Sequence, residues 1–367
     1  MSRKIIVGVD IRDLHIAKTG ARTYLEELCK EFGIEKNDCL FYYFDTDFPV
    51  YTGRNKFFKL IEQFRFIFWK QVVLPLKAWS KRCDIIFCTD YFVPYVHLGY
   101  KTVPVLHDAF FWEYPAHYNR YWLKVFKYLG VTAARRSSRI IAPTEYAKNR
   151  ILEFMKVEPD KIVTIPEAPK SLIIYPEKES DSPAKFILHI GTFEKRKNLV
   201  RLIEAFSKLR SQGFTDYTLV LGGQSSPKTD MDDTANIISA IAKHKVSDFV
   251  IMPGYIPDNK LSYYYKNAEI YIFPSLNEGF GLPVLEAFQH DLPVLISNNT
   301  CLPEVGGDAV VSFDPYDVDD IAKKMVLLIK DTELRSLLIS KGTKRLQSYS
   351  WANTALQLTE VFKSIAK

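Results

Sequence analysis

Short apolar runs alternate with longer amphipathic stretches along most of this chain, and they do so in two successive sets. The strand candidates of the first set are Ile5–Val9, Leu40–Phe44, Ile85–Cys88, Thr102–Leu106, Ile140–Pro143 and Ile162–Ile165. Those of the second set are Phe186–Ile190, Thr218–Gly222, Phe249–Met252, Ile270–Phe273, Val294–Ser297 and Ala309–Phe313. Helical stretches such as Thr23–Phe32, Tyr121–Arg136, Val318–Lys330 and Glu333–Ser348 lie between or after them. This alternation predicts an α/β protein with parallel sheets, because each parallel connection needs a crossover.

The length of 367 residues predicts about two domains, since it exceeds what one hydrophobic core usually holds. The stretch 171–185 is polar and contains prolines, so we expect it to be a linker. The domains would then be 1–170 and 186–349. Ligands of open parallel sheets bind at the carboxyl ends of the strands, which predicts a site in a cleft between the two halves.

The composition is that of an ordinary globular protein, with 47% hydrophobic and 25% charged residues. No apolar stretch approaches the roughly 20 residues that a membrane-spanning helix needs, and no secretory signal pattern is visible at the start. The five cysteines are scattered, and Cys83 and Cys88 would lie on opposite faces of a strand. We therefore expect a reduced, cytoplasmic protein.

Positive charge is concentrated in the first half, where residues 1–170 hold 27 Lys and Arg against 19 Asp and Glu. Residues 54–82 contribute eight of these basic residues and one acidic residue, interleaved with phenylalanines and tryptophans. One interpretation is peripheral contact with an anionic membrane, on its inner face. The other is a core-facing helix whose outer side is basic. Nucleic-acid binding is not expected, because no recognised motif accompanies the charge.

Residues 274–286 (PSLNEGFGLPVLE) follow an apolar run and predict a strand, a glycine turn and a helix that Pro283 opens. The backbone N–H groups of residues 280–282 would face the helix mouth, where an anion is stabilised. Glu278 precedes the turn, and Glu286 lies about one turn inside the helix. Carboxylates beside a phosphate must bind neutral hydroxyls to avoid repulsion. The predicted ligand carries phosphate in the middle and hydroxyls at both ends, which describes a nucleotide sugar.

A basic turn, GTFEKRKN, lies between a predicted strand and helix of the second half. Its cations Lys195, Arg196 and Lys197 oppose the helix dipole at a helix start, so stability alone does not explain them. A diphosphate would supply the missing counter-charge, and neutralising it would improve the leaving group. The alternative is a solvated basic turn.

Six segments, in order, resemble glycosyltransferase family 4 (glycosyl transferases group 1), the retaining nucleotide-sugar enzymes with the GT-B fold. They cover nearly the whole chain and are VGVDIRDLHIAKTGARTYLEEL, VPVLHDAFFWEYP, RIIAPTEYAKNRI, FILHIGTFEKRKNLVRLIEAF, GYIPDNKLSYYYKNAEIYIFPSLNEGFGLPVLEAF and PVLISNNTCLPEVGGDAVVSFDP. The resemblance implies two Rossmann-like, doubly wound parallel-sheet domains that face a central cleft. It makes the first the acceptor domain and the second the nucleotide-sugar domain, with a helix at 350–367 returning to the first.

The resemblance also assigns roles to residues. It implies His107, Glu278 and Lys197 as catalytic residues. The nucleotide-sugar-binding residues that it implies are Gly20, Arg196, Lys197, Ile256, Glu278, Gly279, Phe280, Gly281, Leu282 and Glu286. Glu278 would bind sugar hydroxyls, Glu286 the ribose, Lys197 the diphosphate and the backbone near Ile256 the base. The sequence departs from the family at Thr192, where many members have a further arginine, and at Gly20, where many have two adjacent glycines.

We therefore expect a retaining hexosyltransferase that moves a sugar, with mannose favoured on the resemblance alone, to a glycan or lipid-linked acceptor in cell-surface polysaccharide biosynthesis. Neither a cofactor nor a metal is expected. Of the three Asp-x-Asp patterns, the one at 45–47 belongs to the acceptor half, away from the basic turn, the one at 230–232 is expected in a surface loop, and the one at 317–319 is expected to cap the start of a helix. The alternatives are another GT-B enzyme, such as a phosphorylase or an epimerase, or a non-catalytic nucleotide-sugar-binding protein. A Rossmann oxidoreductase is disfavoured because no G-x-G-x-x-G follows the first strand of either half.

Overall fold

The computed structural model describes residues 3–16, 20–34, 38–53, 55–117, 120–170, 183–226 and 230–366. The chain forms two compact units, which are described separately. Unit 1 comprises Met1–Ala168 together with Ser350–Lys367, and unit 2 comprises Pro169–Tyr349. Most of the expected linker, 171–182, lies outside the described residues.

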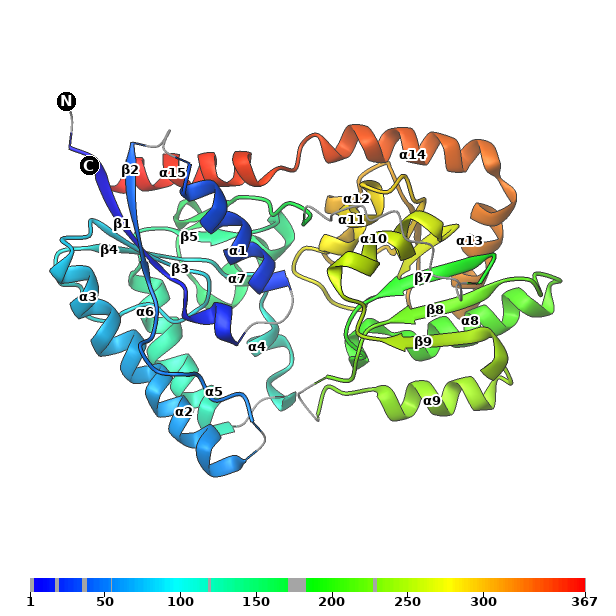
Figure 1. Cartoon of the computed structure of the whole chain (residues 1–367), viewed down its shortest axis with the longest axis horizontal. Helices are drawn as coiled ribbons and strands as arrows, with labels where there is room; N and C mark the ends of the chain where they lie inside the picture. Colours follow the sequence, from blue (N-terminus) through cyan, green and yellow to red (C-terminus); the bar gives the residue numbers. More distant parts are fainter. Residues whose placement is uncertain are drawn as a thin grey trace. The chain divides into compact units, whose positions relative to one another are not determined.

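Unit 1 is an α/β unit that begins with a buried strand (Figure 1). Its strands are β1 (Ile5–Asp10), β2 (Cys39–Phe44), β3 (Ile85–Cys88), β4 (Lys101–Pro104), β5 (Ile140–Ala142) and β6 (Ile162–Thr164). Its α-helices are α1 (Gly20–Phe32), α2 (Lys56–Phe68), α3 (Leu74–Ser80), α4 (Phe110–Glu113), α5 (Arg120–Val125), α6 (Val131–Arg136), α7 (Glu145–Met155) and α15 (Trp351–Ala366). Its short 3₁₀ or π turns are η1 (Arg12–His15), η2 (Trp69–Val73), η3 (Pro115–His117), η4 (Phe126–Gly130) and η5 (Pro159–Lys161).

The main sheet of unit 1 has the strand order β2-β1-β3-β4, and all its pairs are parallel. Strands β5 and β6 form a separate parallel pair, which an isolated bridge from Val105 to Ile141 joins to the end of β4. Helix α15 packs against α1 and β1, where Phe362 contacts the rings of Phe32 and Phe87. The C-terminal helix is therefore part of the core of unit 1.

Unit 2 is a second α/β unit with one larger sheet. Its strands are β7 (Phe186–Ile190), β8 (Thr218–Gly222), β9 (Val250–Gly254), β10 (Ile270–Phe273), β11 (Val294–Ser297) and β12 (Val311–Phe313). Its α-helices are α8 (Leu199–Ser211), α9 (Thr234–Lys243), α10 (Asp258–Asn267), α11 (Leu282–Phe288), α12 (Leu302–Gly306), α13 (Val318–Lys330) and α14 (Thr332–Leu346). Its short 3₁₀ turns are η6 (Lys195–Lys197) and η7 (Ser247–Phe249).

The unit 2 sheet has the strand order β12-β11-β10-β7-β8-β9, and every pair is parallel. The chain adds strands outward from β7 in one direction and outward from β10 in the other, so the two neighbouring central strands mark a topological switch point. Loops that leave the carboxyl ends of strands at such a point diverge and expose a ligand crevice. The sheet thus places the loop after β7 beside the loop after β10.

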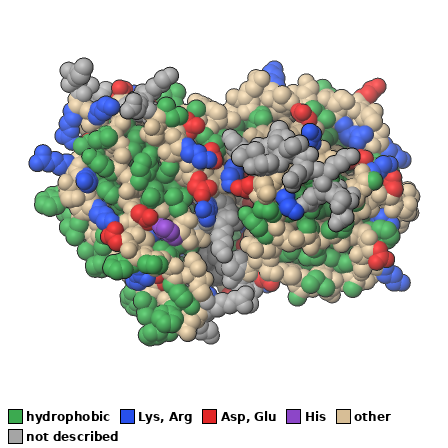
Figure 2. Space-filling model, in the orientation of Figure 1, with side chains coloured by type: hydrophobic (Ala, Val, Ile, Leu, Met, Phe, Trp, Pro, Cys, Tyr) green, Lys and Arg blue, Asp and Glu red, His purple; other side chains and the backbone are tan. Residues whose placement is uncertain are grey.

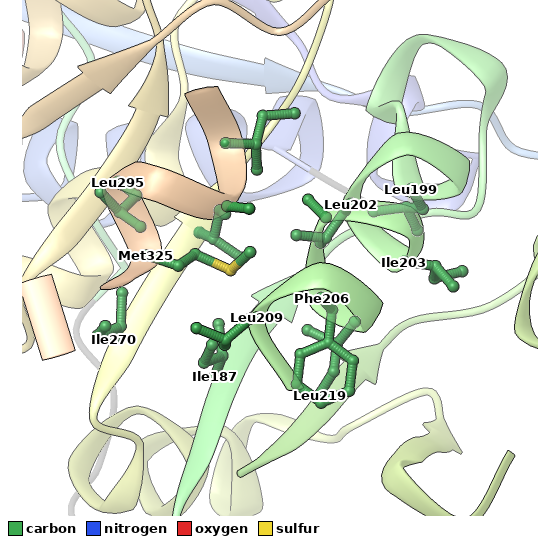
Figure 3. Close-up of a cluster of buried hydrophobic side chains, with 14 of the residues drawn as sticks. Ile187, Leu199, Leu202, Ile203, Phe206, Leu209, Leu219, Ile270, Leu295 and Met325 are labelled. Carbon is green, nitrogen blue, oxygen red and sulfur yellow. The ribbon is translucent and has the colours of Figure 1, made fainter. Parts of the chain in front are cut away.

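The hydrophobic core of unit 2 lies between the sheet and the helices α8 and α13. Figure 3 shows Leu209 of α8 beside Ile187 of the sheet, and Phe206 of α8 beside Leu219. The strands read as continuous apolar runs because helices cover a parallel sheet on both faces.

The predicted helix Tyr121–Arg136 is confirmed as one continuous helical stretch, in which the π turn η4 lies between α5 and α6. A π turn inserts one residue into the helical ladder, a local adjustment that apolar periodicity alone does not reveal. Strands β7, β8, β10 and β11 and helix α13 have the bounds that the pattern predicted.

Candidate functional site

The glycine turn between β10 and α11 has the predicted form, with a buried strand, a loop at 274–281 and a helix. Gly281 has φ of +104°, and a Cβ there would lie 2.8 Å from Leu302 Cδ2, so glycine is required. Pro283 occupies the second helical position, one later than expected, where an N–H would still lack an intrahelical partner. The N–H groups of residues 280–282 donate no hydrogen bond to any described residue. They remain available to an anion.

Glu278 forms ion pairs with two residues that lie 81 and more positions earlier in the sequence. Lys197 Nζ donates to Glu278 Oε1 at 2.6 Å. Arg196 Nη1 lies 2.8 Å from Glu278 Oε2 and donates to the Asn277 carbonyl at 3.1 Å. The neighbouring strands β7 and β10 bring these residues together. Both carboxylate oxygens of Glu278 are therefore engaged by cations.

The cations of the basic turn do not lack counter-charge, and this part of the sequence argument was wrong. Arg196 Nε also donates to Glu194 Oε2 at 2.7 Å, so Glu194 and Glu278 balance Arg196 and Lys197. The alternative of a solvated turn is also wrong for Lys197, which is buried. Lys195 is exposed and stands outside this group.

The electrostatics of the group keep Glu278 ionised. Burial alone would raise the pKa of this carboxyl, but Arg196 and Lys197 outweigh burial and lower the pKa to about 2. Burial, assisted by the charge of Arg196, lowers the pKa of Lys197, while Glu278 opposes that change. The carboxylate is therefore charged at neutral pH and has no proton to donate.

Buried side chains hold the loop after β7 and the loop after β10 in place. Asn198, in the left-handed conformation with φ of 60°, donates from Nδ2 to the Pro274 carbonyl at 3.1 Å. Cys301 Sγ donates to the carbonyls of Glu278 at 3.3 Å and Phe280 at 3.1 Å. Cys301, in the segment after β11, therefore supports the loop that follows β10.

His189 of β7 is a site residue that sequence reasoning missed. It is fully buried, and its Nδ1 lies 3.0 Å from the Ile272 carbonyl. Burial, with the charge of Lys197, lowers the pKa of His189 to about 3, so the ring is neutral. Nε2 has no partner among the described residues, and a Cβ at Gly191 would lie 3.1 Å from it. The available signal was a histidine that interrupts an apolar strand one residue before its carboxyl end.

Glu286 of α11 belongs to a separate hydrogen-bonded group. Tyr265 donates its hydroxyl to Glu286 Oε2 at 2.8 Å, and His290 Nδ1 lies 2.8 Å from the Glu286 carbonyl oxygen. Burial raises the pKa of Glu286, and the Tyr265 hydrogen bond opposes this rise. The two glutamates of the Glu-x7-Glu pattern thus stand in different environments, one beside cations and one beside a tyrosine.

The residues that follow β7 and β8, Gly191 and Gly223, approach each other closely and are both glycines. Gly223 has φ of +155°, and a Cβ there would lie 1.8 Å from the Gly191 carbonyl oxygen. A Cβ at Gly222 would lie 2.5 Å from Ile256 Cδ1. Ile256 is buried, with only 8% of its surface exposed. Its contact with a base stays a prediction.

In unit 1, His107 follows β4 and contacts residues that the sequence did not single out. Its Nδ1 lies 2.8 Å from Glu167 Oε1, and its ring meets the edge of Tyr24 with centroids 5.1 Å apart. Burial would lower the pKa of His107, but Glu167 reverses this and raises the pKa above its ordinary value. Gly20, a nucleotide-sugar-binding residue in the family resemblance, opens helix α1.

The Asp-x-Asp patterns have local partners. Asp317 caps α13 by accepting from the Asp319 and Asp320 N–H groups, as predicted. Asp45 Oδ1 lies 2.9 Å from His15 Nε2. Among the residues that the structure describes, no group of three His, Cys, Asp or Glu could hold a metal ion. No helix in the same described part has the length and hydropathy to span a bilayer.

Two family models match this chain. Residues 18–168 match the model described as Glycosyltransferase Family 4, and residues 173–345 match the model described as Glycosyl transferases group 1. The chain is 27% identical to O-antigen chain mannosyltransferase B of Escherichia coli, over 83% of this chain and 80% of that protein. It is 29% identical to serotype-specific mannosyltransferase WbdA of Escherichia coli, over 76% of this chain but only 36% of that longer protein.

Solved structures share the fold at low identity. Sucrose-phosphate synthase of Thermosynechococcus elongatus aligns over 99% of both chains with a TM-score of 0.75 and 18% identity. HepE of Anabaena, solved in complex with UDP and glucose, aligns over 98% of this chain and 100% of that chain, with a TM-score of 0.70 and 16% identity. The two α/β units with parallel sheets, the two family models and these relatives agree. The chain belongs to the group 1, family 4 glycosyltransferases and has their GT-B fold.

Proposed function

We propose that this glycosyltransferase moves a hexose, with mannose as the first candidate, from a nucleoside-diphosphate sugar to a glycan or lipid-linked acceptor in cell-surface polysaccharide biosynthesis. The observation that carries the proposal is the contact of Lys197 and Arg196 with Glu278 beside a glycine turn with free N–H groups. The names of the mannosyltransferase relatives favour mannose, and the UDP and glucose bound to HepE favour a nucleotide-sugar donor.

The cations act on the leaving group. When a diphosphate enters, its oxygens compete with Glu278 for the Lys197 ammonium and the Arg196 guanidinium. Phosphate oxygens bound there and at the N–H groups of residues 280–282 are neutralised as the bond to the sugar breaks. Stabilising charge that develops on a leaving group is often the largest single term in catalysis.

Glu278 pairs with the two cations before the donor binds. Once the diphosphate has displaced it from them, the carboxylate can bind the sugar. The carboxylate, which the neighbouring cations keep ionised before the donor binds, then accepts hydrogen bonds from the sugar hydroxyls, close to an anomeric carbon that becomes positive. We assign it no nucleophilic role. In the proposed retaining step, the bond from the anomeric carbon to the phosphate oxygen breaks and the acceptor oxygen bonds to the same face. The departing phosphate oxygen takes the acceptor's proton.

The remaining residues position the two substrates. Glu286, held by Tyr265, would accept hydrogen bonds from the ribose hydroxyls, and the backbone near Ile256 would contact the base. In unit 1, His107 would approach the transferred sugar, with Glu167 fixing its ring. The acceptor would be reached from the cytoplasm, with residues 54–82 in peripheral contact with the inner face of a membrane.

A donor screen followed by product analysis tests this function. Purified protein is melted with GDP-, UDP- and ADP-sugars, because a ligand that binds only the native state raises the melting temperature. The donor that stabilises the protein should then yield nucleoside diphosphate and a lengthened acceptor with the donor's anomeric configuration. Three other outcomes would contradict the proposal. An epimerised nucleotide sugar would indicate an epimerase, a phosphate-dependent reaction would indicate a phosphorylase, and binding without turnover would indicate a non-catalytic nucleotide-sugar-binding protein.

Metal independence is a separate part of the proposal. Lys197 and Arg196 are placed to take the role that a divalent cation has in other transferases, so activity should be unchanged in EDTA. Loss of transfer in EDTA, restored by Mn²⁺ or Mg²⁺ but not by Ca²⁺, would contradict the role given to these two residues.

A further inference from the structure

Residues 56–80 of unit 1 form one uninterrupted helical run, made by α2, η2 and α3. It is roughly 37 Å long at 1.5 Å per residue. Large apolar side chains recur along it at intervals of three and four residues and are exposed to solvent. They are Phe57, Ile61, Phe64, Phe68, Val72, Leu76 and Trp79, and we call this set the outer stripe. Phe57 and Phe64 are each 67% exposed and Trp79 is 63% exposed.

A contiguous group of large apolar side chains is unusual on a solvent-exposed surface. Monomeric soluble proteins rarely expose contiguous apolar patches of more than a few hundred Å², and larger ones mark interaction sites. Figure 2 shows hydrophobic side chains gathered on the surface at the lower left, over the first part of α2. Phe58 and Leu60, exposed by 50% and 52%, widen the patch beside the stripe.

The opposite side of the same helical run carries buried charge. Lys70 is 1% exposed, and its Nζ lies 2.6 Å from Asp10 Oδ2 and 2.8 Å from Asp90 Oδ1. Glu62 pairs with the buried Arg12. The run therefore has inverted polarity, with ion pairs toward the protein and hydrophobic groups toward the outside. These inward charges fix how the helical run is rotated, so the outer stripe cannot turn into the core without breaking them.

The charges of the same segment indicate what covers the stripe. Glu62 is the only acidic residue in 55–82, and it faces inward. Lys59, Lys81 and Arg82 are exposed. Protein–protein interfaces are enriched in aromatic residues but depleted in lysine. Helices that lie in a membrane interface combine Trp, Phe and Leu on one face with Lys and Arg beside them.

We propose that the outer stripe inserts into the headgroup layer of a bilayer that contains anionic lipid, with Lys81 and Arg82, which are exposed just after the last turn of the run, binding lipid phosphates. The helical run then lies in the plane of the surface and does not cross it. The docking surface is independent of the donor that the enzyme uses, because none of its residues is part of the transfer site. The alternative left open by the sequence, a helix with a basic outer side, is thereby replaced by an apolar outer side followed by basic residues.

Vesicle binding by the full-length protein tests this proposal without donor or acceptor. Wild type should float with vesicles of phosphatidylcholine and phosphatidylglycerol, bind vesicles of phosphatidylcholine alone more weakly, and lose the difference at high salt. Phe64→Gln and Trp79→Gln should each weaken binding about tenfold, since each removes a large buried apolar contact. Lys81→Glu should weaken binding to anionic vesicles by at least fivefold.

Matched controls come from exposed residues of the same kinds elsewhere. Leu356→Gln in α15 and Ile238→Gln in α9, each removing a side chain that is 56% exposed, should leave vesicle binding unchanged, as should Lys243→Glu. All variants should keep the wild-type melting temperature, because the changes lie on the surface. No binding to anionic vesicles, or equal loss in the controls, would overturn the proposal. So would a wild-type dimer in sedimentation that Phe64→Gln dissociates, because the stripe would then cover a second copy.

Discussion

Glu278, Arg196 and Lys197 show how neighbouring residues determine the chemistry of one carboxyl. A lone glutamate after a strand could be an acid, a base or a nucleophile. Two cations within 2.8 Å keep this one ionised and use both of its oxygens. It therefore competes with phosphate for the cations until a donor binds. Because of this competition, replacing Glu278 and replacing Lys197 should change the affinity for the nucleoside diphosphate in opposite directions.

We expect Glu278→Gln to reduce transfer by at least about 100-fold, because it removes charge stabilisation at the reacting carbon. The same change should tighten binding of the nucleoside diphosphate, since the cations lose a competitor. Lys197→Met should weaken both turnover and diphosphate binding. Calorimetric titration with the nucleoside diphosphate, beside steady-state kinetics, measures the two effects. Wild-type turnover by folded Glu278→Gln, or equal signs in the two titrations, would falsify the assigned roles.

His107 should titrate above the ordinary histidine value, because Glu167 outweighs burial. A pKa raised in the folded state stabilises the fold below the unfolded-state value of about 6.5. That stability should disappear as the pH rises through the folded-state pKa. The ring resonances of His107 in an NMR titration report the midpoint directly. Glu167→Gln should lower the midpoint, since the main contributions that oppose burial are then lost, and an unchanged midpoint would show that Glu167 does not act on His107.

At the scale of elements, the glycine turn and η6 converge because β7 and β10 are neighbours in the sheet. Each loop alone is a common connection between a strand and a helix. Their contact, through Lys197 and Glu278, exists only because the strand order reverses at this pair. The turn must therefore keep its backbone path for the contact to form.

Gly281→Ala should destabilise unit 2 by about 1–3 kcal/mol, because a side chain at positive φ is strained and this one would also meet Leu302 at 2.8 Å. Gly213→Ala provides the matched control, since φ is +98° there and no atom lies within 4 Å of the added Cβ. Denaturant unfolding of the two variants separates backbone strain from the clash. A larger loss in Gly213→Ala than in Gly281→Ala would contradict the packing argument.

At the scale of the whole molecule, the chain returns to its first unit at its last helix. Residues 350–367 belong to unit 1, although unit 2 separates them from Ala168 in the sequence. Trp351 meets the ring of Tyr24, the same tyrosine that touches His107. The core of unit 1 is therefore incomplete until the end of the chain is present.

Phe362→Ala should destabilise unit 1 by about 3–5 kcal/mol, the usual loss for a large buried aromatic, because Phe362 is fully buried. Hydrogen exchange of the β1 amides should accelerate, while that of the β8 amides stays as in wild type, since compact units open separately. Leu356→Ala, at a position 56% exposed on the same helix, is the control and should change neither. If Phe362→Ala instead accelerated hydrogen exchange in β8 and not in β1, helix α15 would belong to unit 2.

The sequence by itself determined the α/β class, most strand positions, the strand–turn–helix form around Gly281 and the family. The first three follow from local properties, namely apolar runs, amphipathic spacing and the restricted φ of glycine and proline, whereas the family was identified from the resemblance of six segments. Only the tertiary structure decided the partners of the charged residues. It paired Glu278 with Arg196 and Lys197, gave Arg196 a second carboxylate in Glu194, joined Glu167 to His107 and left His189 beside Lys197. Strand order brings residues from distant parts of the chain together, and no property of one segment specifies which segment will lie beside it.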